Sequence, residues 1–583
     1  MTTSPSTVDP GVTDLGAGAP PISEALLAQL ANEIFATLPG GVPTAPTLTA
    51  PTGPVAVSSL SLPASPPQSP VRPPSAAVPP APTFADAPLP APSTHGASGV
   101  DPTQFGLPSD AELKALLAPA IASPRSPATG DNSAGGFYFL SEIATRTPPP
   151  YQGPTQPDDA FRPVLVDQVR VAHPGFDVNA IRKDFPILAE TVHGKPLIWF
   201  DNAATTQKPQ AVIDRIAYFY AHENSNIHRA AHDLAARATD AYEEAREKAR
   251  GFLNAGSTNE IVFVRGTTEA INLVAKSWGA QNIEAGDEII VTHLEHHANI
   301  VPWQQLAADK GAVLRVAPVD DSGQILLDQY EKLFSSKTKL VSLTQVSNAL
   351  GTVTPAKQMV AIAHRHGALA LVDGAQSVSH MTTDVQALDA DWFVFSGHKV
   401  FGPTGIGVLY GKEDLLNGTQ PWQGGGNMIA DVTFEKTVFQ PAPGRFEAGT
   451  GNIADAVGLG AAIDYVQRIG MENIARYEHE LLVYATKGLL TVPGLRLIGT
   501  AAEKASVLSF VLDGYSTEQV GKALNEEGIA VRSGHHCAQP ILRRFELEAT
   551  VRPSLAFYNT CVEVDKLVEV LLDLRGGRIA LPG

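Results

Sequence analysis

The stretch ALALVDGAQSVSHMTTDVQALDADWFVFSGHK, residues 368–399, contains two short apolar runs that each end in polar residues. The runs ALALV and WFVF are almost continuously apolar, which is typical of strands buried on both faces of a parallel sheet. Ligands of such sheets bind beyond the carboxyl ends of the strands. The residues to inspect are therefore Asp373, after the first run, and the Ser-Gly-His-Lys turn at 396–399, after the second.

The same alternation of apolar runs and amphipathic stretches extends over the chain from about residue 176 onward. Strands are expected at 288–293, 340–347, 368–375, 392–397 and 407–411. Helices are expected at 238–253 and 355–367. Buried strands that alternate with amphipathic helices predict an α/β fold with a mainly parallel sheet.

Other polar residues follow the remaining strands of this predicted sheet. The strand ending at 293 leads into HLEHHAN, which holds His293, His296 and His297, and Asn348 follows the strand at 340–347. Gly266, Thr267 and Thr268 lie between the apolar run IVFV and a helix, where amides and hydroxyls converge on an anion.

Together these residues favour one cofactor, pyridoxal phosphate. It needs a lysine for its Schiff base and a carboxylate beside its pyridine nitrogen. It also needs hydroxyls and amides around its phosphate. Each feature has a plainer explanation: Asp373 as a turn residue, SGHK as a solvated turn, and Gly-Thr-Thr as a helix cap. Their combination in this order favours the cofactor.

Composition excludes several other classes of function. The net charge of −18 argues against sequence-independent nucleic-acid binding, which depends on Lys and Arg. Two cysteines in 583 residues exclude a disulfide framework and fit a reducing compartment, so we expect a cytoplasmic protein. No run of apolar residues is long enough to span a membrane, and the first residues resemble neither a signal peptide nor a transit peptide.

Residues 1–170 differ in composition from the rest of the chain. They are rich in Pro, Ala and Ser, and between residues 41 and 100 the only charged residues are Arg72 and Asp86. Such a segment cannot bury enough apolar surface to offset its ordering entropy, so we expect a disordered arm. Short apolar motifs interrupt it at 20–38, 107–121 and 135–143. They could dock onto a partner or pack back onto the catalytic part.

Ten stretches carry a resemblance to a known family: FDNAATTQKP (200–209), NSNIHRAAH (224–232), FVRGTTEAINLVA (263–275), EHHANIVPWQ (295–304), VSNALGT (346–352), DGAQSVSH (373–380), FSGHKVFGPTGIGVLYG (395–411), RFEAGT (445–450), RSGHHCAQP (532–540) and RPSLAFYNT (552–560). From about residue 176 the chain resembles the group II (SufS-type) cysteine desulfurases, which are fold-type I pyridoxal-phosphate enzymes. The resemblance implies a large cofactor domain at 176–460 with a seven-stranded sheet. It also implies a smaller α/β domain at 461–583, against which residues 176–200 pack.

The resemblance also implies how the cofactor is held. Lys399 carries it as a Schiff base and moves protons, and Asp373 pairs with its pyridine nitrogen. His296 stacks on the ring and relays a proton, while Gln376 bonds the ring oxygen. Four side chains hold the phosphate: Thr267, Thr268, Ser396 and His398. Thr450 resembles the residue that reaches the phosphate of the neighbouring subunit, which implies a homodimer.

Four further residues would handle the substrate, L-cysteine. Asn348 and Arg552 resemble the groups that bind its carboxylate, a task that suits the planar fork of arginine. His228 and Arg532 line the pocket in the same pattern. The neighbouring histidine-rich stretch could attract zinc, but the cofactor already accounts for His296, so we expect no metal.

Cys537 is the expected nucleophile. Cleavage of the substrate Cβ–Sγ bond needs a sulfur acceptor, and a protein thiolate is the natural one, giving alanine and a persulfide on Cys537. A buried structural thiol is the alternative, but Gly534, His535 and His536 beside it argue against an apolar setting. Cys561, at an expected helix start, fits the structural alternative better.

Two further questions stay open at the level of sequence. Selenocysteine lyase, or a related β-elimination activity, is an alternative on the same fold. The arm resembles the cargo-loading segment of desulfurases packaged in encapsulin-type nanocompartments, where several weak motifs would act by avidity. It could instead bind a scaffold or a SufE- or SufU-like sulfur acceptor.

Overall fold

The computed structural model describes residues 176–228 and 232–579. The arm predicted at 1–170, with its motifs at 20–38, 107–121 and 135–143, lies outside the described residues. Within the described part of the chain, no helix has the length and apolar character needed to cross a membrane.

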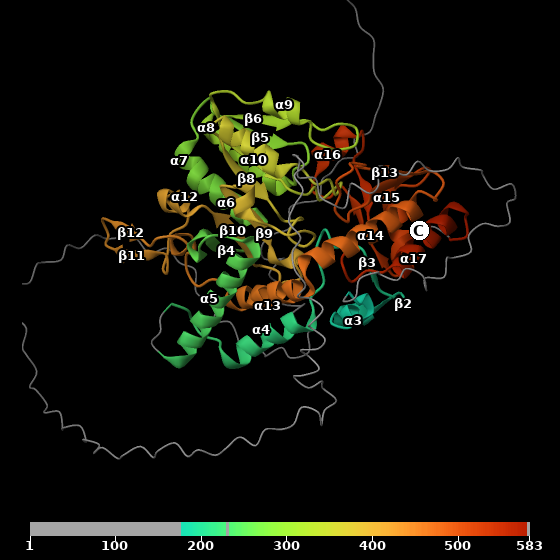
Figure 1. Cartoon of the computed structure of the whole chain (residues 1–583), viewed down its shortest axis with the longest axis horizontal. Coiled ribbons are helices and arrows are strands. Elements are labelled where there is room, and N and C mark those ends of the chain that lie inside the picture. The colour runs from blue at the N-terminus through green and yellow to red at the C-terminus, as the bar shows by residue number, and fades with distance from the viewer. Residues whose placement is uncertain (1–175, 229–231, 580–583) are drawn as a thin grey trace, which may run out of the picture. The chain divides into compact units, whose positions relative to one another are not determined.

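A seven-stranded sheet forms the centre of the described part (Figure 1). Its strands are β4 (Ile261–Val264), β5 (Glu288–Thr292), β6 (Val313–Ala317), β7 (Thr338–Thr344), β8 (Leu369–Asp373), β9 (Trp392–Ser396) and β10 (Gly407–Gly411). They are ordered β4-β10-β9-β8-β7-β5-β6, and β10 alone runs antiparallel to its two neighbours. The predicted mainly parallel seven-stranded sheet is therefore confirmed.

Successive residues of a strand point to opposite faces of the sheet, so these apolar strands present apolar side chains on both faces. Helices cover each of the two faces. Phe263 and Val372 face one apolar cluster, and Val262 and Leu371 face the other. The first cluster includes side chains of α4 (Gln210–His222), α5 (Asp233–Leu253), α10 (Ala356–Arg365) and α13 (Ile453–Ile469). The second includes side chains of α6 (Thr267–Val274), the π-turn η6 (Ala275–Gly279), α8 (Val301–Lys310) and α12 (Glu413–Gly418).

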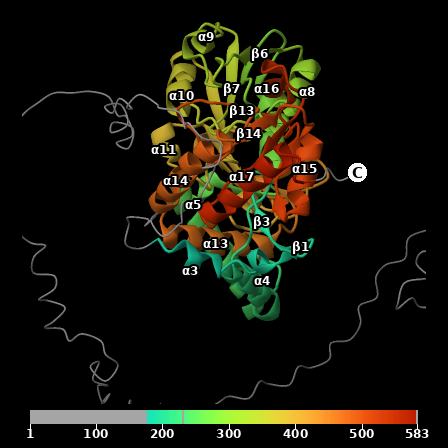
Figure 2. The same cartoon turned by 90° about the vertical axis from the view of Figure 1, so that its right-hand side faces the viewer.

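A four-stranded antiparallel sheet forms the C-terminal part, seen from its helical side in Figure 2. Its order is β13 (Leu495–Ile498), β14 (Ser509–Leu512), β17 (Thr550–Arg552) and β16 (Arg532–Gly534). The helices of this part are α14 (Met471–Leu489), α15 (Thr517–Glu526), α16 (Gln539–Arg544) and α17 (Cys561–Arg575). The Thr560–Glu563 capping box begins α17, so Cys561 is its first residue, as expected.

The N-terminal described segment packs against this C-terminal part. β3 (Ile198–Trp199) pairs in parallel with β15 (Ile529–Ala530), and Arg182 forms an ion pair with Glu563 at 2.9 Å. The boundary expected between residues 460 and 461 falls inside α13, a continuous helix that contacts both α5 and α14.

Shorter elements complete the described chain: α3 (Val178–Arg182), η4 (Pro186–Ala189), β1 (Thr191–Val192), β2 (Lys195–Pro196), η5 (Thr258–Glu260), α7 (Ala280–Asn282), η7 (His297–Asn299), α9 (Leu327–Glu331), α11 (Val385–Leu388), η8 (Gly397–Lys399), β11 (Ile429–Val432), β12 (Thr437–Phe439) and η9 (Gly444–Phe446). Two of them carry residues of the candidate site: η8 follows β9 directly, and η7 begins a few residues after the end of β5.

Candidate active site

A cavity of about 230 Å³ lies at the carboxyl ends of the parallel strands, where such sheets bind ligands. Twelve of the residues predicted from sequence line it: Thr267, Thr268, His296, Asn348, Asp373, Gln376, Ser396, His398, Lys399, Arg532, Cys537 and Arg552. His228 and Thr450 are not among its lining residues.

Asp373 is the last residue of β8 and is almost fully buried. The backbone N–H of Ala375 donates to its Oδ1 at 2.9 Å. Gly374 has no space for a side chain, because a Cβ there would lie 1.9 Å from the ring of Phe393. Burial raises the pKa of Asp373, and the Ala375 amide and the Lys399 charge only partly oppose that effect. A cationic partner such as a pyridinium nitrogen would therefore stabilise its ionised form.

Lys399 closes the short helical turn η8 after β9. The cavity leaves its side chain partly accessible, yet the surrounding protein removes the amine from bulk water. This burial lowers the pKa of Lys399 to about 8, although Asp373 raises it. A larger neutral fraction at physiological pH is what a Schiff-base lysine requires.

The start of α6 offers an anion site. Gly266 precedes it with φ of +150°, and a Cβ there would lie 3.1 Å from Ser396 Oγ. The Thr267 N–H donates to Ser396 Oγ at 2.9 Å, and the two hydroxyls are also 2.9 Å apart. Burial lowers the pKa of His398 to about 4, so its ring is neutral and can donate a hydrogen bond without adding charge. Hydroxyls at a helix N-terminus suit a phosphate.

His296 and Gln376 are held in fixed orientations by backbone groups. The Ala298 N–H donates to His296 Nδ1 at 3.0 Å, so the neutral ring carries its proton on Nε2. Burial lowers the pKa of His296 to about 3. Gln376 Nε2 donates to the Ala203 carbonyl at 2.6 Å. Both residues line the cavity.

Arg552 and Asn348 leave buried polar atoms without partners at another wall of the cavity. Arg552 donates from Nη1 to the Asn348 carbonyl at 2.8 Å and from Nη2 to Asp201 at 3.2 Å. Asn348 Nδ2 donates to the His536 carbonyl at 2.7 Å. Arg552 Nε and Asn348 Oδ1 are buried and unpaired. Since buried polar atoms are normally satisfied, these atoms fit a polar ligand such as a carboxylate and its ammonium group.

Cys537 lies in the loop between β16 and α16, partly exposed at the cavity. His536 and Cys537 both adopt positive φ, 53° and 54°, which is costly for residues with side chains. The loop is fixed where the His297 N–H donates to the Cys537 carbonyl at 2.8 Å. The Cys537 N–H donates to His535 Nδ1 at 3.0 Å. The thiol is thus presented by a strained and well-anchored turn.

Cys561 has a different setting. It lies against the apolar cluster at the start of α17. Burial raises the pKa of its thiol, and Asp565 adds to this effect. A thiol with a raised pKa is a poorer nucleophile at neutral pH.

Two acidic residues that contact the site, the partly buried Asp201 and the fully buried Glu295, carried no assignment from sequence. Asp201 accepts from both Arg552 and Arg532 and lies in the stretch FDNAATTQKP. Glu295, one residue before His296, is fully buried and accepts from Thr292 Oγ1 and Asn299 Nδ2, both at 2.6 Å. Burial raises the pKa of Glu295 to about 8. Asp201 lies in the motif FDNAATTQKP and Glu295 in the motif EHHANIVPWQ, so these two motifs could have pointed to them as site residues.

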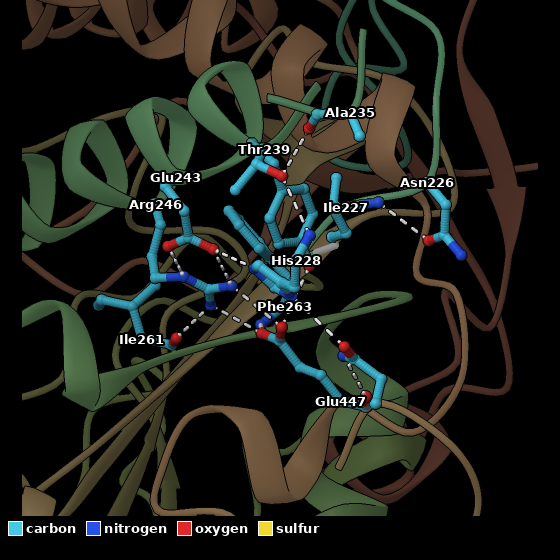
Figure 3. Close-up of polar contacts among 12 residues, drawn as sticks. Asn226, Ile227, His228, Ala235, Thr239, Glu243, Arg246, Ile261, Phe263 and Glu447 are labelled. Carbon is cyan, nitrogen blue, oxygen red and sulfur yellow. Dashed lines mark hydrogen bonds and ion pairs between the residues drawn. The ribbon is translucent and has the colours of Figure 1, made fainter. Parts of the chain in front are cut away.

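His228 and Thr450 lie elsewhere in the described chain. His228 bonds Glu243 through Nε2 at 2.9 Å (Figure 3). Its Nδ1 lies 3.4 Å from Asn427 Oδ1. Thr450 lines a second cavity together with Asn224 and Asn226.

Comparison with known proteins identifies the family. The aminotransferase class-V family model matches residues 198–567. A cysteine desulfurase of Synechococcus elongatus is 63% identical over 510 residues, which cover 86% of this chain and 80% of that protein. A probable cysteine desulfurase 1 of Mycobacterium leprae is 66% identical over 402 residues, or 69% of this chain and 66% of that protein.

Solved structures give the same result. The crystal structure of the Escherichia coli cysteine desulfurase CsdA, in an S-sulfonic acid form, matches with a TM-score of 0.65 and 38% identity. The match covers 70% of this chain and 100% of that one. As a pyridoxal-phosphate-dependent enzyme of the aminotransferase class-V fold, the chain belongs to the cysteine desulfurase family.

Proposed function

We propose that the chain is a group II (SufS-type) enzyme that moves the sulfur of L-cysteine onto Cys537 as a persulfide and releases L-alanine. The observation that carries this proposal is the shared cavity of Lys399, Arg552 and Cys537. Cys537 stands there on a strained turn, whereas Cys561 packs against the core.

The residues present fit pyridoxal phosphate. Asp373 would face its pyridine nitrogen, Lys399 would bind its carbonyl carbon, and the start of α6 with Ser396 and His398 would hold its phosphate. When bound, the cofactor supplies an electron sink for bonds broken at the substrate.

The side chains of this chain account for the remaining chemistry. Arg552 would bind the substrate carboxylate through its unpaired Nε–H, and Asn348 Oδ1 would accept a hydrogen bond from the substrate amino group, which orients the substrate Sγ toward Cys537. The Cys537 thiolate then attacks that Sγ, so an S–S bond forms as the substrate Cβ–Sγ bond breaks. The electron pair of the broken bond stays with the substrate carbon, which takes up a proton. Lys399, with its pKa near 8, is suited to holding and returning protons at that position.

Alanine release from L-cysteine tests this proposal. We expect wild-type protein and Cys561→Ala to form alanine with a reductant present, and Cys537→Ala to form little. Mass spectrometry of protein treated with cysteine but no reductant should find one added sulfur atom on the peptide containing Cys537. Equal alanine formation by Cys537→Ala would refute the persulfide step and favour the selenocysteine lyase or β-elimination alternative.

We further propose that residues 1–170 direct a homodimer into an encapsulin-type nanocompartment in the cytoplasm. The support is the composition of the arm and its apolar motifs. The match to the Synechococcus relative covers 86% of the chain, so it includes part of the arm as well as the enzyme. Co-expression with an encapsulin-type shell protein should give co-purifying particles, and deletion of residues 1–170 should abolish them. Shell association that survives the deletion would refute this role and favour an arm that binds a sulfur acceptor.

A further inference from the structure

Arg246 is a buried cation on α5 with two carboxylate partners (Figure 3). Its Nη1 and Nη2 donate to the two oxygens of Glu447 at 2.7 and 3.0 Å, which is a bidentate pair. Its Nε donates to Glu243 at 2.9 Å. The guanidinium also donates to the Ile261 carbonyl at 2.7 Å. Burial of the guanidinium and of the Glu447 carboxylate removes both charges from water, which is costly, so the buried pair is stable only with all of these hydrogen bonds formed.

Aromatic rings hold the guanidinium in a single orientation. It lies 5.1 Å from the ring centre of Tyr242 and 4.8 Å from that of Phe263. The Tyr242 hydroxyl donates to Glu447 at 3.2 Å, and the Phe263 N–H donates to it at 2.8 Å. Lysine could supply the charge at this position but not the planar fork that both carboxylates use.

Glu447 leads directly to Thr450. Its backbone carbonyl accepts from Asn427 Nδ2 at 3.1 Å, and the Gly449 N–H donates to the Gly426 carbonyl at 2.8 Å. These contacts fix the chain up to the residue before Thr450. The Arg246–Glu447 pair is therefore the buried anchor of this segment.

Glu243 leads to His228. Its Oε1 pairs with His228 Nε2 at 2.9 Å, and the His228 N–H donates to Thr239 Oγ1 at 3.0 Å. His228 has a positive φ of 59°, so its backbone needs this support. One arginine thus holds, through two carboxylates, the two predicted site residues that do not line the Lys399 cavity.

The segments that Arg246 holds line the second cavity, which contains Thr450 and has a volume of about 390 Å³. Asn224 and Asn226 come from the segment before His228, and Thr450 comes from the segment after Glu447. Tyr220 of α4 also lines it and is 61% exposed. Exposed aromatic side chains beside a polar concavity are typical of a protein interface.

We propose that Arg246 is a positioning residue that holds the His228 and Thr450 segments in place to complete the active site of a second copy of this chain. This inference rests on the proposed function and on its homodimer. Arg246 of one subunit then serves the Lys399 cavity of the other subunit, and it contributes nothing essential to the cavity of its own.

Heterodimers test the direction of this effect. Arg246→Met and Lys399→Ala chains carrying different tags are co-expressed, and tandem purification isolates dimers that contain one of each. Arg246→Met alone should fall by about tenfold to a hundredfold in kcat/KM, as expected for misplaced site residues, and Lys399→Ala alone should be inactive. In the heterodimer, the Arg246→Met subunit keeps its own Lys399 and receives intact segments from its partner. About half of the wild-type turnover per dimer should return, because one of two symmetric sites is whole.

A second pair and a milder variant make the outcomes distinct. A heterodimer of Thr450→Ala and Lys399→Ala chains should recover activity in the same way. If Arg246→Met does not fold, Arg246→Lys, which keeps the charge, takes its place and should show the same loss alone and the same recovery in the heterodimer. Recovery of the Thr450 pair without recovery of either Arg246 pair would refute our assignment of Arg246. Failure of all pairs, with an active wild type, would refute the shared site but uphold the desulfurase. An inactive wild type would instead refute the proposed function itself.

Discussion

Replacing Lys504 with methionine should remove a pH dependence from the unfolding of this enzyme. Lys504 Nζ donates to the Leu350 carbonyl and, at 2.9 Å, to the Gly499 carbonyl. No ion pair of Lys504 with a carboxylate is found among the described residues. Although part of its stem is accessible, burial of the amine lowers the pKa of Lys504 from 10.5 to about 7.

The sign follows from proton binding. Between pH 7 and 10.5 the unfolded chain holds a proton on this amine and the folded chain does not, so the free energy of unfolding rises with pH over that window. The full slope is about 1.4 kcal/mol per pH unit for one such group. Between pH 8 and 9.5 the wild type should therefore gain roughly 2 kcal/mol relative to Lys504→Met. All other titrating groups are common to both proteins and cancel in the difference.

Urea unfolding of the two proteins at pH 7, 8, 9 and 9.5, followed by far-ultraviolet circular dichroism, measures that difference. Methionine preserves the unbranched stem but leaves two carbonyls without their donor, which shifts the variant curve by a nearly constant amount. Only the change with pH tests the reasoning. Parallel curves across this range would show that the amine is not held neutral in the folded protein, and would refute it.

Three other predictions follow from named contacts. Arg552→Lys should raise KM for L-cysteine by about tenfold or more with a smaller change in kcat, because lysine lacks the fork that binds a carboxylate; steady-state kinetics that show an unchanged KM would contradict this. Glu447→Gln should destabilise the fold by about 3 kcal/mol or more, since it removes the buried, bidentate carboxylate of Arg246 and leaves that cation only the partly exposed Glu243 as an anionic partner. Glu243→Gln, at a 41% exposed side chain, should cost less than about 1 kcal/mol in the same urea titration. Cys561→Ser should form alanine at the wild-type rate, and a large loss would give that thiol a chemical role.

Much of the fold was predictable because its signals are local. The strands expected at 288–293, 392–397 and 407–411 are confirmed as β5, β9 and β10 to within a residue. Continuous apolar runs between amphipathic helices suffice to predict a parallel sheet, since only a strand covered on both faces tolerates them. The antiparallel direction of β10 was not predicted. Residues 397–406 connect β9 to β10, and only the pairing of these two strands shows that direction.

The candidate site was predictable only as far as it follows strand ends and recognisable motifs. Asp373 and Lys399 could be picked out from sequence because Asp373 ends a buried strand and Lys399 lies in the short turn that follows another. Asp201 could not be linked to Arg552, because the two are far apart in sequence and meet through a contact of the C-terminal part with the first described strands.

The sequence by itself determined the fold class and the cofactor, because short motifs at strand ends carry that information, and it predicted different roles for the two cysteines. Only the tertiary structure decided which of these residues share a cavity. It brings Thr267 and Ser396 to 2.9 Å, places His228 and Thr450 outside that cavity, and ties both to Arg246. The physical reason is that a buried arginine needs carboxylate partners, and the packing of segments distant in sequence decides which carboxylates reach it. No local sequence pattern specifies those partners.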